Sequence, residues 1–262
     1  MKKLPISVTI ITLNESGRIG DAIRSVKEWV DEVIVVDSGS NDDTVCTCKS
    51  LGATVFYNKW PGYGEQKRYA EELSSNDWIL NIDADERIST ELMKEIYSIF
   101  MNERELADAY YIPIHDIIYP TSRVSKSTPY YPVRLYRKSK GRYSESPVHD
   151  RVIMNIKSNT LNLEGKILHH PIKNYTHRVE KMNKYSSAQV DDMQTKGRKA
   201  SVTRIFLEFP ISFIKRYIFK HYWREGVAGF IYSMNYAYSR FLRQIKLYER
   251  EKNKKTNSLQ GP

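Results

Sequence analysis

The sequence predicts an α/β fold, in which a doubly wound, mostly parallel sheet is followed by a helical C-terminal extension. In the first half of the chain, short apolar and β-branched runs alternate with segments whose apolar residues recur at helical spacing. From Tyr175 onward only the helical spacing continues. Short strands that alternate with helices favour βαβ units, which build parallel sheets.

The individual elements follow from the same spacing rules. Each expected strand is a short apolar run that ends at polar residues, and each expected helix carries an apolar stripe. The middle of the chain, residues 109–170, is rich in Tyr, Pro, Arg and His and is expected to add strands and loops to the sheet. The expected strands are 7–13, 33–36, 54–57 and 78–82, and the expected helices are 41–51, 63–73, one capped by Ser89 and one that carries Ile19, Ile23, Val26 and Val30.

The composition indicates a folded globular protein with an anionic partner. Hydrophobic residues make up 40% of the chain, and the two cysteines allow neither a disulfide framework nor a multi-cysteine zinc site. The net charge is +10, and residues 196–262 hold 15 Lys/Arg against 4 Asp/Glu. Basic and aromatic residues interleaved on helices suit an anionic membrane surface or a nucleic acid.

The most informative segment is Trp78-Ile-Leu-Asn-Ile-Asp-Ala-Asp-Glu86, in which acids follow an apolar strand. Alternate residues of a strand share a face, so Asp83 and Asp85 are expected to project together where the strand ends. Paired carboxylates are hard oxygen ligands for Mg²⁺ or Mn²⁺, which keep positions open for phosphates. The alternative is a pair of solvated acids, which the D-x-D spacing alone does not exclude.

Two further polar turns follow strands. Asp37 and Ser38 follow the second strand, and the Asp37 carboxylate is expected to accept hydrogen bonds from a nucleobase or ribose. Residues 41–43 beside it are interpreted mostly as caps for the next helix. Asn14 and Glu15 end the first strand, where a simple strand-to-helix turn is the alternative. In a parallel sheet these turns meet in one crevice beyond the carboxyl ends of the strands, where ligands bind.

Together these motifs resemble the family 2 glycosyltransferases, which have the GT-A fold. The T-L-N-E of the first strand, the V-V-D-S-G-S-x-D-x-T turn and the L-x-x-D-A-D-E segment follow that family's pattern. Further segments are similar to the lipopolysaccharide-core glucosyltransferase subfamily, and this similarity extends to about Tyr248. These segments are Trp60-Pro-Gly-Tyr-Gly-Glu-Gln-Lys67, Arg134-Leu-Tyr-Arg137, Val148-His149-Asp150 and the helical tail with Gly226 and Gly229.

The resemblance implies a sugar-nucleotide site in the crevice. Asp85, together with Asp83, would bind Mg²⁺ or Mn²⁺, which bridges the diphosphate and stabilises the departing UDP as a Lewis acid. Lys67 would lie near the diphosphate or the acceptor. Arg134 and Arg137 are candidates for hydrogen bonds to phosphate oxygens, with an exposed basic strand as the alternative. The residues expected to bind the nucleotide sugar are Thr12, Asn14, Glu15, Asp37, Ser38, Lys67, Asp83 and Arg134.

Direct inversion at the sugar carbon requires one carboxylate to take the proton of the acceptor hydroxyl. The transition state is expected to resemble an oxocarbenium ion, as in glycoside hydrolysis. Asp150 is the candidate base, and Glu86, which adjoins the acid pair, is the alternative. His149, His169 and His170 are candidates for a further metal ligand or a phosphate contact, but a lone histidine is more often structural, so only His149 is retained.

The sequence therefore predicts an inverting, metal-dependent glycosyltransferase. It would move a hexose, glucose from UDP-glucose, to a lipid-linked oligosaccharide acceptor in the synthesis of lipopolysaccharide core or another cell-envelope glycan. One alternative is an enzyme that transfers the sugar to a polyprenyl phosphate. Another is a basic nucleic-acid-binding module, but that class leaves the acidic strand ends unexplained, so nucleic acid is not expected as a partner.

Three regions are expected along the chain. Residues 1–172 are predicted to form a nucleotide-sugar-binding and catalytic domain, residues 173–250 a helical, basic region on the membrane or acceptor side, and residues 251–262 a flexible tail. No run reaches the roughly 20 apolar residues that span a bilayer, and no signal-peptide cleavage site follows the first apolar run. The protein is expected to be cytoplasmic and peripheral on the inner face of the bacterial cytoplasmic membrane.

The C-terminal helices are expected to divide their surfaces between core and membrane. The apolar stripe from Val227 to Ile245 is expected to lie mostly in the core of its own domain. Lys215, Arg216 and Lys220, which interleave with aromatic rings, are expected to contact an anionic leaflet.

Overall fold

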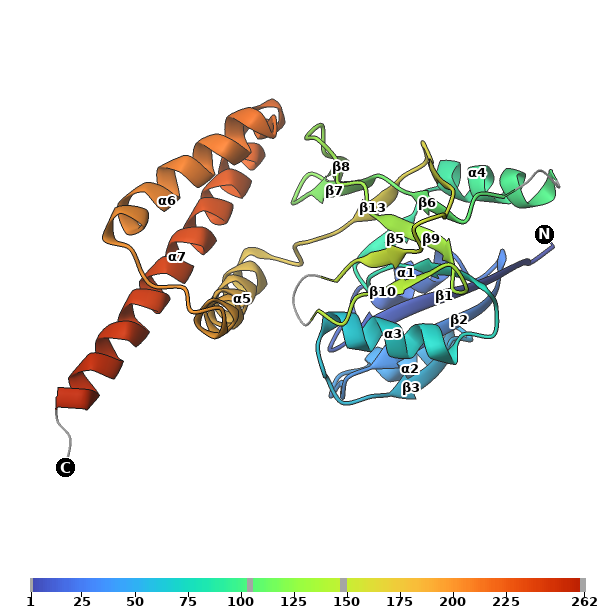
Figure 1. Ribbon diagram of the computed structural model, residues 1–262. Coiled ribbons are helices and arrows are strands. Elements are labelled where there is room, and N and C mark those ends of the chain that lie inside the picture. The colour runs from blue at the N-terminus through green and yellow to red at the C-terminus, as the bar shows by residue number, and fades with distance from the viewer. Residues whose placement is uncertain (1, 103–105, 147–149, 260–262) are drawn as a thin grey trace. The chain divides into compact units, whose positions relative to one another are not determined.

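The structure is a computed structural model that describes residues 2–102, 106–146 and 150–259. It contains two compact units, whose elements are labelled in Figure 1. The first unit comprises Met1–Asp116 and Pro129–Pro171, and the second comprises Ile117–Thr128 and Ile172–Pro262.

A seven-stranded sheet in the order β12-β6-β9-β4-β1-β2-β3 is the framework of the first unit. Neighbouring strands are parallel except where β9 takes part. The expected fold class, a mostly parallel α/β sheet with a helical C-terminal part, is therefore confirmed. The strands are β1 (Leu4–Thr12), β2 (Val30–Asp37), β3 (Thr54–Tyr57), β4 (Trp78–Asn81), β6 (Ala109–Tyr111), β9 (Val133–Arg137) and β12 (Thr160–Asn162), and β10 (Gly141–Tyr143) and β11 (Val152–Met154) form a separate antiparallel pair.

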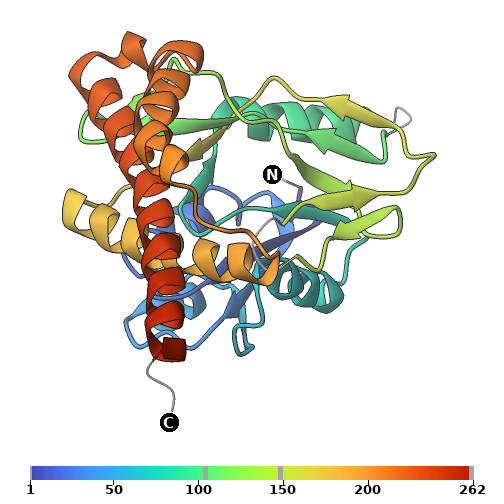
Figure 2. The same ribbon diagram turned by 60° about the vertical axis from the view of Figure 1, so that its left-hand side comes forward.

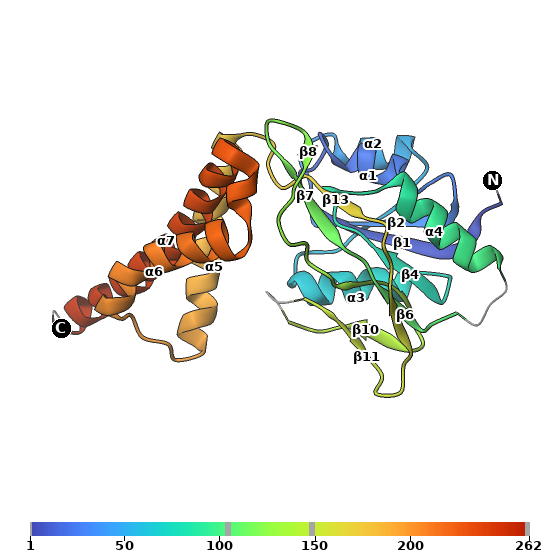
Figure 3. The same cartoon turned by 90° about the horizontal axis from the view of Figure 1, so that it is seen from above.

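Helices cover both faces of this sheet (Figure 3). Successive residues of a strand point to opposite faces. Val33 and Val35 of β2 therefore belong to the core shared with α1, α2 and α4. Ile34 and Val36 belong instead to the core on the other face, with Ala70 of α3. The helices are α1 (Ile19–Arg24), α2 (Thr44–Ser50), α3 (Tyr63–Leu73) and α4 (Thr90–Met101).

Three short strands bring distant segments to the carboxyl end of β4. β5 (Glu86–Ile88) pairs antiparallel with β13 (Ile167–His169), which pairs parallel with β7 (Ile114–Ile118). The register sets Glu86 beside His169, and His169 beside Asp116. Side chains from three separate parts of the sequence thus meet next to the main sheet.

Most expected elements are found, with shifts at their ends. Strand 54–57 and helix 63–73 have the expected bounds. Ser89 caps α4, because its side chain accepts a hydrogen bond from the N–H of Leu92. The expected helix through Val30 is wrong at its end: α1 stops at Arg24 and Val30 begins β2, where it pairs with Leu4 of β1.

The second unit is a group of helices (Figures 1 and 2). α6 and α7 run side by side and are joined at one end by two short helical turns, and α5 packs against α7. Within this unit the end of β7 pairs with β8 (Arg123–Val124). The helical elements are α5 (Tyr175–Thr195), α6 (Val202–Ile214), the π-helical turn η1 (Lys215–Phe219), the 3-10 turn η2 (Tyr222–Glu225) and α7 (Gly226–Leu259).

The buried face of α7 is not the apolar stripe that the sequence suggests. Val227 is 76% exposed and Phe230 46% exposed, whereas Ser233 and Gln244 are buried. The cause lies at Gly229, where a Cβ atom would come within 1.8 Å of the carbonyl oxygen of Tyr222. This close approach packs η2 on the Gly229 side of the first turns of α7, and farther along Leu247 packs with Val190 and Met193 of α5.

Among the residues that the structure describes, no helix is both long enough and apolar enough to cross a membrane.

Candidate functional site

Hydrogen bonds join the loop after β1 to the loop after β2. Asn14 has φ 56°, in the left-handed region, which Asn adopts more readily than most residues. Its N–H donates to Ser40 Oγ at 2.8 Å, and its Oδ1 accepts from the N–H of Asn41 at 2.9 Å. The N–H of Glu15 donates to Thr44 Oγ1 at 2.8 Å. The two strand ends at which nucleotide binding is expected therefore form one connected surface.

Asp37 organises the turn that follows β2. Its side chain is buried, and its Oδ2 accepts hydrogen bonds from the N–H groups of Gly39 at 2.9 Å and Ser40 at 2.8 Å. The hydroxyl of Ser38 accepts a hydrogen bond from Gln66 Nε2 at 3.0 Å. Because each carboxylate oxygen can accept two hydrogen bonds, Asp37 fixes the turn and retains acceptor capacity for a ligand.

Asp42 stabilises the start of α2. It accepts hydrogen bonds from the N–H of Thr44 at 3.0 Å and from the N–H of Ser16 at 3.3 Å. Burial alone would raise the pKa of Asp42, but the hydrogen bonds from Thr44 and Ser16 lower this pKa to about 2. The N-cap residue Asp43 makes no side-chain cap bond, and Asp42 is the member of the predicted group 41–43 that accepts from the first N–H of α2.

Thr12 contributes a buried hydroxyl without a partner. It ends β1 beside Asp37 in the strand register and is 4% exposed. Its Oγ1 makes no hydrogen bond in the structure. An unpaired buried hydroxyl costs about 1–3 kcal/mol, so a ligand group that bonds to it would recover that cost. The atom lies at the carboxyl end of β1, whose neighbours β2 and β4 lie on opposite sides, which is where doubly wound sheets bind ligands.

A second group of side chains gathers around Lys67 of α3. Its Nζ lies 3.0 Å from Asp83 Oδ1 and 2.7 Å from Asp150 Oδ2. Arg134 reaches the other oxygen of Asp83, at 3.2 Å. Lys67 and Arg134 are 3% and 6% exposed, so both cations have lost most of their contact with water. The structure thus brings together Lys67, Asp83, Arg134 and Asp150, four residues predicted from the sequence.

The charges in this group shift one another's pKa values. Burial alone would raise the pKa of Asp83, but Lys67 and Arg134 outweigh it and hold this pKa well below its usual range. Burial alone would lower the pKa of Lys67, but Asp83 and then Tyr143 and Asp150 raise it above its usual value. Lys67 and Asp83 are therefore both charged at neutral pH.

Glu86 lies beneath the same group. It is 2% exposed, and its Oε1 accepts a hydrogen bond from Arg134 at 2.8 Å while its Oε2 accepts one from the N–H of Asp83 at 2.8 Å. Burial raises the pKa of Glu86, and Arg134 offsets part of this rise. Both oxygens face protein groups, so Glu86 is placed to hold Arg134 and the acidic turn.

Asp85 belongs to a separate group. Its Oδ2 lies 3.4 Å from Arg18 NH1 and 3.6 Å from His169 Nε2, and His169 Nδ1 lies 2.8 Å from Asp116 Oδ1. Arg18 also forms a two-point ion pair with Glu15, at 2.8 Å and 2.6 Å. The carboxylate of Glu15, expected in the nucleotide pocket, is thus engaged by Arg18.

The different partners of Asp83 and Asp85 follow from the backbone between them. β4 ends at Asn81, and the N–H of Glu86 closes a turn on the carbonyl of Asp83 at 2.9 Å. Strand alternation, which was expected to place both aspartates on one face, therefore does not apply to this segment.

Asp85 and His169 carry atoms of the kinds that ligate divalent cations, although the cation Arg18 faces the same carboxylate. Burial alone would lower the pKa of His169, but hydrogen bonds to Asp116 and Asp85 outweigh it and raise this pKa to about 10. If a metal displaced that proton, Asp85 would offer an oxygen ligand and His169 a nitrogen ligand. Two protein ligands would leave positions for diphosphate oxygens.

Asp83 and His149 are the other two metal ligands expected from the sequence. Both oxygens of Asp83 are paired with Lys67 and Arg134, so its role as a ligand stays a prediction. His149 lies outside the described residues. Within the described ranges, no group of three or more His, Cys, Asp and Glu side chains is arranged to hold a metal ion.

Arg18, Asp116 and His169 were not among the site residues chosen from the sequence. The spacing of Glu15 and Arg18 is a visible signal, because residues three apart meet on a helical turn. Asp116 and His169 meet only because β13 inserts between β5 and β7, and no local pattern reveals that pairing.

A buried polar network supports the site from within the sheet. Asn81 Oδ1 accepts hydrogen bonds from Tyr143 Oη at 2.7 Å and from Arg134 NH1 at 2.8 Å, while its Nδ2 donates to Thr9 Oγ1 at 3.0 Å. Lys67 Nζ lies 5.1 Å above the ring of Tyr143. Asn81 and Tyr143 thus hold Arg134 and Lys67 in addition to the ion pairs that these two cations form with the acids.

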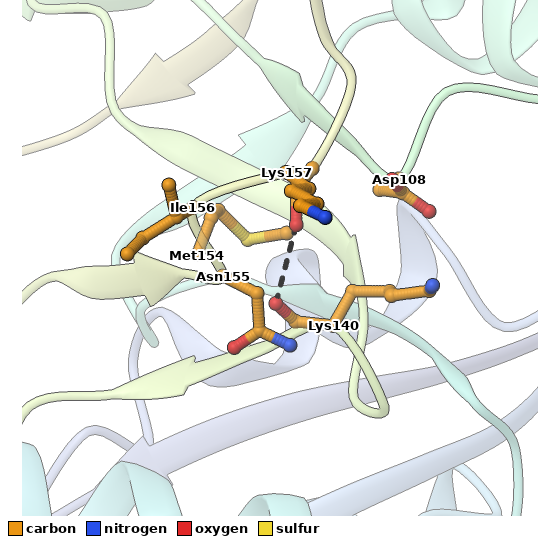
Figure 4. Close-up of a pocket in the computed structure, with 7 residues that line it drawn as sticks. Asp108, Lys140, Met154, Asn155, Ile156 and Lys157 are labelled. Carbon is orange, nitrogen blue, oxygen red and sulfur yellow. Dashed lines mark hydrogen bonds between the residues drawn. The ribbon is translucent and has the colours of Figure 1, made fainter.

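A surface hollow of about 500 Å³ lies beside the start of β6 and the segment between β11 and β12 (Figure 4). Asp108, which precedes β6, lines it, and the backbone carbonyl of Asp108 accepts a hydrogen bond from the N–H of Arg137 at 2.9 Å. Arg137 stacks on Trp78 at the start of β4, 4.6 Å from the ring centroid. The phosphate contact suggested for Arg137 is therefore wrong, because this residue lies at the amino end of β4, away from the acids.

The chain has close relatives among known proteins. Residues 7–155 match the glycosyl transferase family 2 profile. A protein of Rickettsia felis named "Uncharacterized glycosyltransferase" is 40% identical over 93% of this chain and 89% of the relative. The lipopolysaccharide core biosynthesis glycosyltransferase LpsC of Rhizobium meliloti is 32% identical over 95% of this chain and 93% of that protein.

Solved structures match a smaller part of the chain. TarS residues 1–349 of S. aureus, in complex with UDP-GlcNAc, is 23% identical with a TM-score of 0.38, over 48% of this chain and 38% of that one. Glucosyl-3-phosphoglycerate synthase of Mycobacterium tuberculosis, in complex with Mn²⁺, UDP and glucosyl-3-phosphoglycerate, is 27% identical with a TM-score of 0.34, over 42% of this chain and 43% of that one.

Proposed function

Because the chain belongs to glycosyltransferase family 2, we propose that it is an inverting, metal-dependent enzyme that transfers a hexose to a lipid-linked acceptor. The donor is proposed to be UDP-glucose and the acceptor an oligosaccharide of the bacterial cell envelope, such as lipopolysaccharide core. The name of LpsC, which is similar over nearly the whole chain, supports this acceptor class.

One observation carries the nucleotide site: the unpartnered hydroxyl of Thr12 beside Asp37. A nucleobase or ribose presents both donors and acceptors, so it can pair with this hydroxyl and with the acceptor position that remains on Asp37 Oδ1, to which the Ser40 hydroxyl already donates. Asn14 and Ser38 fix the two loops that carry these groups. The pocket for the nucleoside is therefore proposed at the carboxyl ends of β1 and β2.

The diphosphate is proposed to lie toward Asp85. Asp85 and His169 would hold Mg²⁺ or Mn²⁺, which supplies Lewis-acid stabilisation of the charge that gathers on the departing UDP. Arg18, 3.4 Å from Asp85, orients this carboxylate from the protein side.

Asp150 is proposed as the general base. In the transfer step the acceptor hydroxyl oxygen attacks the anomeric carbon, the bond from that carbon to the diphosphate oxygen breaks, and the hydroxyl proton passes to Asp150. Lys67 orients Asp150 through the 2.7 Å ion pair and anchors it to Asp83. Glu86, which is 2% exposed, is the less accessible alternative.

An anionic membrane surface is the proposed partner of the second unit, on the cytoplasmic face of the inner membrane. Residues 196–262 carry 15 Lys/Arg against 4 Asp/Glu, and each basic residue near an anionic leaflet contributes about 1 kcal/mol. Residues 173–250 are proposed to act as this membrane and acceptor region, residues 1–172 as the catalytic domain and residues 251–262 as a tail.

Ligand binding separates this function from a nucleic-acid-binding module. Thermal unfolding should shift upward with UDP-glucose or another nucleotide sugar in the presence of Mn²⁺, and Thr12→Val should reduce the shift. Filter binding of DNA and RNA is the parallel measurement. Tight nucleic-acid binding without any nucleotide-sugar effect would reject the proposed function.

A further inference from the structure

Helix α6 is apolar on nearly every side but is scarcely buried. Its sequence from Val202 to Ile214 contains only two charged residues, and the one buried side chain in it is Ser212. Phe206 is 75% exposed and Ile211 58% exposed. A helix that is hydrophobic all round normally lies in a protein core or in lipid. The core of its own unit does not supply that environment.

The apolar surface continues beyond α6 through the two turns that lead to α7. We name as the apolar tip the residues Ile211, Ile214, Ile218, Phe219, Trp223 and Val227, all of which are exposed large hydrophobic residues. They belong to four consecutive elements, from α6 through η1 and η2 to the start of α7. Figure 1 shows this end of the α6–α7 pair.

A rim of positive charge accompanies the apolar tip. Lys215, Lys220 and Arg224 are exposed, and within the described residues they form no ion pair. The two acids of the region are engaged elsewhere. Glu208 pairs with Arg240 at 2.9 Å, and Glu225 accepts a hydrogen bond from the Ser125 hydroxyl at 3.1 Å.

Arg216 is part of the scaffold of the tip and not of its rim. Its guanidinium lies 4.3 Å above the ring of Tyr222 and 5.0 Å above that of Tyr236, and it donates a hydrogen bond to Tyr222 Oη at 2.6 Å. These contacts fix η1 against η2 and α7. The basic rim therefore includes Arg224 in place of Arg216, for which a membrane contact was expected from the sequence.

We propose that the apolar tip inserts into the interfacial layer of an anionic lipid bilayer, with Lys215, Lys220 and Arg224 at the headgroups. Apolar and aromatic side chains bordered by lysine and arginine are the composition of interfacial membrane anchors. A second copy of the chain is a poorer occupant, because it would bring two positive rims together. The inference rests on the proposed function for its purpose, since insertion would hold the enzyme beside a lipid-linked acceptor.

Vesicle binding of the full-length protein tests this insertion. The wild type should sediment with phosphatidylcholine vesicles that contain phosphatidylglycerol, and much less with phosphatidylcholine alone. The double variant Ile218→Gln, Phe219→Gln should lose about tenfold or more in apparent affinity for the anionic vesicles. The matched control is Ile156→Gln, Leu161→Gln, which removes two exposed apolar residues of the first unit and should bind as the wild type does.

Tryptophan fluorescence reports the depth of insertion. Trp223 and Trp60 are exposed, whereas Trp29 and Trp78 are buried. In the Trp60→Phe variant, brominated lipid in anionic vesicles should quench Trp223. Absence of this quenching, or equal vesicle binding by the double variant and its control, would overturn the proposal. Dimerisation in sedimentation velocity that the double variant abolishes would also overturn it, in favour of a second copy.

The vesicle assay contains neither donor nor acceptor. Its outcome therefore does not depend on transfer. Vesicle binding and quenching by a protein that transfers no sugar in a separate assay with donor and acceptor would support the tip and reject the proposed function. Transfer to a deacylated, water-soluble acceptor without vesicle binding would support the function and reject the tip.

Discussion

The ammonium group of Lys67 lies 2.7 Å from the carboxylate of Asp150 and links that residue to helix α3. The same nitrogen lies 3.0 Å from Asp83, so one buried cation joins the acid that follows β4 to the candidate base. Lys67 was expected near the diphosphate or the acceptor. Its position between two acids makes it a residue that fixes the spacing of the site.

Replacing Lys67 tests this linking role. Lys67→Met leaves Asp83 and Asp150 without their shared cation. Breaking a fully buried ion pair costs about 3–5 kcal/mol. Because both acids are partly exposed, the free energy of unfolding should fall by less, about 1–3 kcal/mol. Transfer should fall by at least tenfold, and Lys67→Arg should recover part of it. Urea unfolding and initial rates are the measurements, with the exposed Lys59→Met as control. Normal transfer by Lys67→Met would refute the role.

Asp150→Asn should remove the base and leave the donor site intact. Asn has the same size but cannot accept a proton at neutral pH. The rate should fall by roughly 10²–10⁴, the usual contribution of general base catalysis, while the affinity for the donor stays near that of the wild type. Steady-state kinetics at saturating donor and acceptor give the comparison.

Glu86→Gln is the control for this assignment. Because Glu86 is buried and holds Arg134 and the Asp83 backbone, its replacement should lower stability by about 1–3 kcal/mol and the rate by less than about tenfold. Normal turnover by Asp150→Asn with a large loss in Glu86→Gln would transfer the role of base to Glu86.

Asp85→Ala should leave the fold intact and abolish transfer. The Asp85 side chain is 13% exposed, and its contacts with Arg18 at 3.4 Å and His169 at 3.6 Å are long, so little of the fold should depend on them. In the wild type, EDTA should silence the enzyme reversibly, and Mn²⁺ should bind more weakly to the variant by calorimetry. Full activity of Asp85→Ala in metal-free buffer would exclude the proposed metal mechanism.

The two cysteines should differ sharply in reactivity. Cys46 is exposed, whereas Cys48 is buried. Burial, with Asp37 nearby, raises the pKa of the Cys48 thiol to about 12, so its reactive thiolate is scarce at pH 8. A thiol reagent at pH 8 should label one cysteine quickly and the second only after denaturation. Rapid labelling of both in the folded protein would contradict the burial of α2.

The sequence predicted the central sheet because its strands and helices are local patterns. Residues 54–57 and 63–73 were placed correctly from apolar spacing alone. The same rule failed on α7, since the close backbone approach at Gly229 and the packing of Leu247 against α5 are tertiary contacts that no periodic pattern reveals. Hydrophobic periodicity therefore predicted the helix but not which of its faces packs against the neighbouring elements.

The residues of the site likewise include some that local patterns predict and some that only long-range strand pairing places. Thr12 and Asp37 end their strands and Asp83 follows β4, so their place at the carboxyl ends of neighbouring strands could be predicted from topology. His169 reaches Asp85 only through the pairing of β13 with β5, which depends on long-range register. The turn after Asn81 likewise separates Asp83 from Asp85, although strand alternation predicted a common face.

Transfer of a hexose from UDP-glucose to a lipid-linked core acceptor, followed by mass spectrometry of the acceptor and by release of UDP, tests the proposed function most directly. With Mn²⁺ or Mg²⁺, the wild type should add one hexose for each UDP released, and Asp150→Asn should add almost none in the same time. If a panel of nucleotide sugars yields neither UDP release nor a glycosylated acceptor, or if the product forms equally well with Asp150→Asn, the proposed transferase and its site would be contradicted.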